Sequence, residues 1–105
     1  MVINRYIIYS CYEYFGANGK DVSSWFRTGK IHKTKEEAEQ ELKVMKELSA
    51  NTDKVSKLKH FFDIRYEDIT QYPIPTYHFH TKGRPSKEDL RKRDEYYAHY
   101  WERYL

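Results

Sequence analysis

Residues 3–15 constrain the fold more than any other segment, because they are rich in isoleucine and tyrosine and contain neither glycine nor proline. This composition favours a β-strand. Apolar side chains occur on both alternating faces, with Ile8 and Tyr12 on one and Ile7 and Cys11 on the other. Such a strand is typically central and covered on both sides for part of its length. We therefore expect a sheet built around this segment.

The residues that follow are expected to supply a partner strand. Residues 16–21 have the composition of a turn. Residues 22–28 should then return as the second strand of a hairpin. Gly29 is expected to end that strand or to introduce a bulge.

A helix is expected next. Thr34 and Glu37 form a capping-box pattern, in which the threonine caps the first turn and the glutamate reaches back. Apolar residues recur at helical spacing to about Leu48, which predicts a helix with one apolar stripe. Residues 49–57 are polar and predict an exit loop.

A second strand signal lies over residues 60–67, where apolar and charged side chains alternate. Phe62, Ile64 and Tyr66 share one face, which predicts a half-buried strand. Residues 72–79 contain two prolines and should be extended. A short strand at the edge of the sheet could form at the end of this segment, because prolines are tolerated at an edge.

The last helix is expected to start at Ser86, with Asp89 completing a weaker capping box. The order of elements predicts an α+β fold: a small antiparallel sheet with a C-terminal helix. We expect one domain over residues 1–105, of which residues 82–105 form a basic and aromatic helical segment.

Length and composition narrow the class of protein. The chain has 105 residues, which suits one domain. Aromatic residues make up 17% of it, so burial must depend on large rings. No apolar run approaches the ~20 residues of a membrane helix, and the N-terminus shows no secretory signal. The single cysteine, Cys11, cannot form an internal disulfide, so a reducing cytoplasm is expected.

Residues 82–93 carry the main excess of positive charge in a chain whose net charge is +3. They hold six basic and two acidic side chains. Such a block attracts phosphate, and a Gly-Arg-Pro sequence among basic residues has a shape that fits the minor groove of DNA. The alternative is a helix start whose charged first turn is solvated.

The sequence Lys82-Gly83-Arg84-Pro85 resembles the core of the AT-hook family of minor-groove binders. The resemblance implies that Arg84 enters the narrow groove of A·T-rich DNA, where negative potential is concentrated. Ser86 stands where the family usually has a second basic residue. The resemblance also implies that flanking cations contact phosphates; these are Lys82, Lys87, Arg91, Lys92 and Arg93.

Five aromatic rings lie in the last ten residues, more than one helical stripe can bury. Tyrosine and tryptophan are favoured anchors of protein interfaces and can also stack on bases. We expect Tyr97 to pack in the core, and we assign Tyr96, Tyr100 and Trp101 as candidate partner-binding residues. Trp101 also suits core packing.

Signatures of catalysis and metal binding are weak. His78 and His80 would point the same way on a strand, but no spacing supplies a third ligand. Cys11 lies within the first expected strand, where burial makes a thiol inert. No serine has the spacing of a nucleophile, and no glycine-rich phosphate loop occurs. We therefore expect no metal, no cofactor and no enzymatic activity.

The Lys/Glu/Tyr-rich composition and the order of strand, helix and strand resemble small accessory proteins of phages and other mobile elements. That resemblance implies a binding role. The first hypothesis is a non-enzymatic protein that engages nucleic acid or a protein that processes it. The alternative is a stoichiometric inhibitor or adaptor of a host protein, such as a defence nuclease or polymerase, with no DNA contact. A homodimer is compatible with either.

Overall fold

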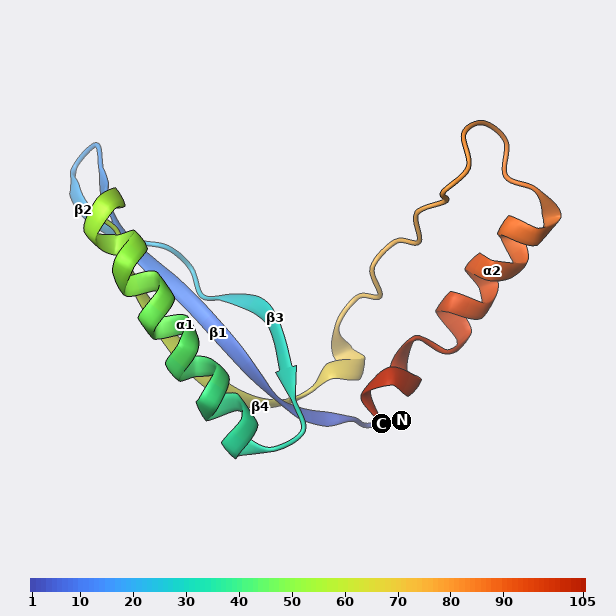
Figure 1. Cartoon of the computed structure of the whole chain (residues 1–105), viewed down its shortest axis with the longest axis horizontal. Coiled ribbons are helices and arrows are strands. Elements are labelled where there is room, and N and C mark those ends of the chain that lie inside the picture. The colour runs from blue at the N-terminus through green and yellow to red at the C-terminus, as the bar shows by residue number, and fades with distance from the viewer. The chain divides into compact units, whose positions relative to one another are not determined.

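The computed structural model describes all 105 residues, which form two compact units (Figure 1). The sheet unit comprises Asn4–Asp68, and the tail unit comprises Met1–Ile3 together with Ile69–Leu105. A four-stranded antiparallel sheet and two α-helices confirm the predicted α+β class. The single-domain assignment over residues 1–105 stays a prediction. None of the helices is both long enough and apolar enough to cross a membrane.

Strand β1 (Asn4–Gly16) is the centre of the sheet, as predicted. Strand β4 (Lys59–Asp68) pairs antiparallel along one of its edges, from Asn4 opposite Asp68 to Glu13 opposite Lys59. The other edge pairs with β2 (Gly19–Val22) and β3 (Phe26–His32). The buried side chains of β1 include neighbours in sequence, which confirms that both faces of this strand are covered.

The return arm of the hairpin is two strands, so the prediction of one strand over residues 22–28 was wrong. Ser23 lies in the break and still satisfies the backbone of β1. The Tyr12 N–H donates to Ser23 Oγ at 2.9 Å, and the Ser23 N–H donates to the Tyr12 carbonyl at 2.8 Å. Gly29 has a φ of 85° where the register with β1 shifts, so it bulges β3 without ending it.

Helix α1 (Lys35–Ser56) starts where the sequence predicts but continues through the expected exit loop of residues 49–57. At its start the Glu37 N–H donates to Thr34 Oγ1 at 3.2 Å. At its end the Thr52 and Ser56 hydroxyls donate to carbonyls four residues back, at 3.4 and 2.9 Å. The polar side chains therefore find acceptors within the helix, so a loop-like composition does not exclude a helix here.

Helix α1 covers one face of the sheet (Figure 1). His60 on β4 faces the helix because its ring bonds to Asp53 of α1. Residues two apart on a strand share a face, and so do register partners, so Ile8, which lies opposite Ile64, is also on the α1 side. Ile8 has no exposed surface.

The alternation predicted for β4 is only partly observed. Phe62 and Ile64 are half-buried, but Tyr66 is 60% exposed, and Arg65 on the opposite face is half-buried. The Arg65 guanidinium lies 4.1 Å from the centre of the Tyr9 ring. A cation that stacks on a ring buries its stem, so the charged face of this strand is not simply solvated.

The tail unit begins with a short 3-10 helix, η1 (Ile69–Gln71), and ends with α2 (Lys87–Ala98) and a second 3-10 helix, η2 (Tyr100–Tyr104). Residues 72–86 form no strand, so the additional edge strand suggested for this segment is absent. Two prolines remove backbone donors there, which disfavours pairing. The capping box at the start of α2 is confirmed.

Candidate nucleic-acid interface

The loop before α2 is closed by one carboxylate. Asp89 Oδ2 accepts hydrogen bonds from the Ser86 N–H at 2.9 Å, the Ser86 hydroxyl at 3.0 Å and the Thr81 hydroxyl at 3.2 Å. The bonds from Ser86, backbone first, hold the pKa of Asp89 below its ordinary value. Because Thr81 and Ser86 both bond to Asp89, the residues between them are held as a short loop.

We call residues 82–85 of this loop the basic tip. Lys82 and Arg84 are exposed and have no hydrogen bond or ion pair with the rest of the protein, and the same holds for Lys87 on the first turn of α2. Gly83 lies at a bend with a φ of 88°, where another residue would be strained. The basic tip is therefore an exposed turn, whereas the AT-hook resemblance implies an extended backbone for these residues.

Of the other three cations predicted for this site, Arg91 and Arg93 form ion pairs with carboxylates and Lys92 forms none. Arg91 pairs with both Glu88 and Glu95, and these bonds and charges, Glu88 first, raise its pKa. Arg93 pairs with Asp94 at 3.2 Å. The charge of Lys92 helps to lower the pKa of Glu88, after the larger effect of Arg91. Spacings of three and four along a helix bring these groups together, so their positive charge is partly neutralised.

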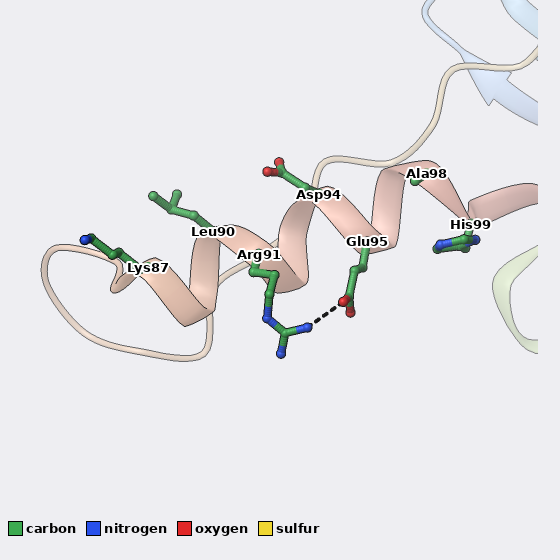
Figure 2. A pocket seen from close by; sticks show the side chains of 7 residues that line it. All are labelled: Lys87, Leu90, Arg91, Asp94, Glu95, Ala98 and His99. Carbon is green, nitrogen blue, oxygen red and sulfur yellow. Dashed lines mark hydrogen bonds and ion pairs between the residues drawn. The ribbon is translucent and has the colours of Figure 1, made fainter.

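A hollow of about 500 Å³ runs along α2 (Figure 2). Figure 2 shows the Arg91–Glu95 ion pair on its wall, with Lys87 and His99 towards opposite ends of the helix. Leu90 and Ala98 add apolar surface. Both signs of charge line this hollow, so it shows no preference for an anion.

The aromatic tail packs mainly on itself, and the burial of Tyr97 and Tyr100 is the reverse of the prediction. Tyr100 is 9% exposed, whereas Tyr97 is 37% exposed. The Tyr100 ring lies 4.8 Å from Trp101 and 5.6 Å from Tyr96. The helix changes to a 3-10 helix at Tyr100, which shifts the side chains away from the α-helical stripe that the sequence suggests.

The buried position of Tyr100 has an electrostatic consequence. Desolvation, with a further contribution from a hydrogen bond to Tyr104, raises the pKa of Tyr100 to about 12. The Arg103 guanidinium also lies 4.8 Å from the centre of this ring. Tyr100 therefore offers little surface to a partner, while Tyr96 and Trp101 remain half-buried.

One polar pair was missed by sequence reasoning. The ring Nδ1 of His60 lies 2.6 Å from Asp53 Oδ1, and the His60 N–H donates to Asp53 Oδ2 at 3.0 Å. No motif spacing marks this pair, because it joins the end of a helix to the start of a strand. Cys11 is buried, and no three His, Cys, Asp or Glu side chains are grouped to hold a metal ion.

Comparison with protein families, with curated proteins and with solved structures found no match for this chain. The AT-hook and accessory-protein resemblances therefore remain hypotheses. The function has to be inferred from the charges and contacts of the residues themselves.

Proposed function

We propose that this chain is a non-enzymatic binding protein that engages nucleic acid through the basic tip and Lys87. The observation that supports the proposal is the set of three exposed cations that have no partner within the protein. Unpaired cations attract phosphate and release counterions when they bind it. A loop already closed by Asp89 loses little conformational freedom on binding.

The acidic groups beside the tip offset only part of this charge. Glu88 is bonded to Arg91, and Asp89 stays charged while it accepts the hydrogen bonds that close the loop, so the three cations remain in excess. In this proposal Arg84 reaches into a narrow minor groove, and Lys82 and Lys87 contact the phosphates. A cytoplasmic binding role also agrees with the resemblance to small phage accessory proteins.

A mobility-shift titration on an A·T-rich duplex tests this proposal at two salt concentrations. We expect binding that weakens with salt, and we expect Arg84→Ala to remove most of it. Arg91→Ala is the matched control, because the same charge is lost from a position already paired with Glu88 and Glu95. Equal binding by wild type and Arg84→Ala would reject the role of the tip.

The second candidate function is stoichiometric binding to a protein that acts on nucleic acid. The hollow on α2 supports it, since mixed charges surround the partly exposed Leu90 (Figure 2). A partner recovered after nuclease treatment, and lost with Leu90→Asp but not with Arg84→Ala, would favour this function over direct DNA contact. Recovery of DNA alone would count against it.

A further inference from the structure

Helix α1 carries apolar side chains that stay exposed. Only Ala38 of its 22 residues is fully buried. Val44 is 50% exposed, Leu48 is 64% exposed and Val55 is 86% exposed. Exposed apolar residues need an explanation when they form a continuous surface, because such surfaces mark interaction sites.

These three residues lie along one side of the helix. Steps of four and seven residues, from Val44 to Leu48 and on to Val55, are those of the heptad pattern of paired helices. At 3.6 residues per turn they lie within about 40° of one another, and Asn51 falls on the same side. Ala38 lies about 120° around the helix from Val44, so this side does not face the sheet. We call Val44, Leu48, Asn51 and Val55 the outer stripe.

The outer stripe continues into a hollow beside the sheet. Leu48 lines this hollow, of about 330 Å³, together with Met45 and Phe62. Phe62 lies on the face of β4 that α1 covers, because it is two residues from His60. A helix that packs along the outer stripe can therefore also reach apolar surface of the sheet.

Two unpaired charges lie beside the outer stripe. Glu47 and Lys54 are seven residues apart, so they lie on the same side of α1, next to Leu48 and Val55. Both are exposed, and neither forms an ion pair within the protein. Charged side chains that flank an apolar seam pair across it, so they select the partner and its orientation.

A second copy of α1 supplies matching charges only when the two helices are antiparallel. With Leu48 of one copy opposite Asn51 of the other, Glu47 of each copy lies beside Lys54 of the other. The two-fold axis repeats this contact, so two ion pairs form. A parallel pair in register would instead place Glu47 level with Glu47 and Lys54 level with Lys54. The charges therefore favour the antiparallel arrangement.

We propose that the outer stripe is a homodimer interface, in which α1 packs antiparallel against α1 of a second copy of this chain. Val44 of one copy packs against Val55 of the other, and Leu48 packs beside Asn51. An asparagine in an apolar seam fixes the register at a cost in affinity. None of these residues belongs to the basic tip, so this inference stands or falls separately from the proposed function.

Sedimentation equilibrium of the full chain over a range of concentrations tests the proposal. We expect wild type to change from monomer to dimer as the concentration rises. Leu48→Asp should weaken the dimer about a hundredfold, because it places a charge in the apolar seam. Ala50→Asp is the matched control and should dimerise like wild type, since Ala50 is exposed on another side of α1.

A charge exchange tests the orientation of the two helices. Glu47→Lys should weaken the dimer about tenfold, because it replaces two attractive contacts with two repulsive ones. Adding Lys54→Glu to that variant should restore the affinity of wild type at low salt. Val55→Ala should weaken the dimer and leave the stability of the dilute monomer unchanged. All of these side chains are exposed, so the variants should fold, and circular dichroism reports this.

The proposal is overturned if wild type stays monomeric at every concentration, or if Leu48→Asp dimerises as tightly as wild type. It is also overturned if Ala50→Asp weakens the dimer as much as Leu48→Asp, or if the double variant is no tighter than Glu47→Lys. Arg84→Ala should dimerise like wild type, which separates the outer stripe from the basic tip.

Discussion

The sheet unit and the tail unit are stabilised by different means. In the sheet unit, β1 has hydrogen-bonded partners along both edges and buries Ile7 and Ile8 almost completely. In the tail unit, α2 buries no residue, and its contacts are caps, surface ion pairs and rings that touch one another. Burial and a continuous ladder of hydrogen bonds stabilise the sheet unit, whereas α2 of the tail unit depends on exposed polar contacts.

The groups that stabilise the fold are therefore different from the groups that could bind a partner. Buried apolar groups contribute most to folding, while exposed ion pairs contribute little and weaken with salt. Exposed charges are also the groups that attract a charged partner. The sheet unit is therefore expected to respond most to core substitutions, and the tail unit to salt and pH.

The largest effect is expected for Ile8→Ala. Ile8 has no exposed surface, so the substitution should lower the free energy of unfolding by about 3 kcal/mol. Val55→Ala on α1 is the control, because Val55 is 86% exposed and its loss should change stability by less than about 0.5 kcal/mol. Urea denaturation measures both. Similar losses for the two variants would contradict the assignment of the core.

A smaller effect is expected for Asp53→Ala, which leaves the His60 ring and N–H without their acceptor. The free energy of unfolding at neutral pH should fall by about 1–2 kcal/mol. Because the folded pKa of Asp53 is lowered, its contribution is present above the unfolded value of about 3.9 and is lost as pH falls through the folded value. Acid unfolding curves that coincide for wild type and variant would reject this role.

In the tail unit, Tyr100 should ionise later than the exposed tyrosines, at a pKa of about 12. The unfolded chain ionises near pH 10, so the contribution of this residue should fall as pH rises above about 10. Spectrophotometric titration of wild type and Tyr100→Phe measures the difference. A late-titrating tyrosine that persists in Tyr100→Phe would show that another ring is the buried one.

The smallest effect is expected for Arg91→Ala, because both of its ion pairs are on the surface. Helix content, measured by circular dichroism, should fall slightly at low salt and match wild type at high salt. A loss of helix content that persists at high salt would mean that Arg91 stabilises the helix by packing and not by its ion pairs.

The sequence predicts the fold well where the pattern is local. The apolar run around Ile7 and Ile8 and the caps at Thr34 and Ser86 depend on near neighbours, and each appears in the structure. The exit loop was misplaced because composition does not show where a side chain bonds. Thr52 and Ser56 bond to carbonyls of the helix, so their polar side chains are satisfied there and do not mark a loop.

The candidate site was predictable only in part. The position of the basic block follows from the sequence, but the pairing of Arg91 with Glu88 and Glu95 depends on rotamers as well as on spacing. The burial of Tyr100 depends on a change of helix type that no single-residue signal marks. The Asp53–His60 pair joins two elements, so it emerges only once the sheet and helix are packed.

The salt dependence of DNA affinity tests the central claim most directly, namely that only Lys82, Arg84 and Lys87 neutralise the charge of the DNA, Arg84 in the groove and the two lysines at phosphates. Three contacts predict a slope of log K against log salt of about −2.7, whereas six would give about −5.4. Arg84→Ala should make the slope less negative by about 0.9, and Arg91→Ala should leave it unchanged. A slope that is the same in Arg84→Ala as in wild type, or one that changes equally in both variants, would contradict the claim.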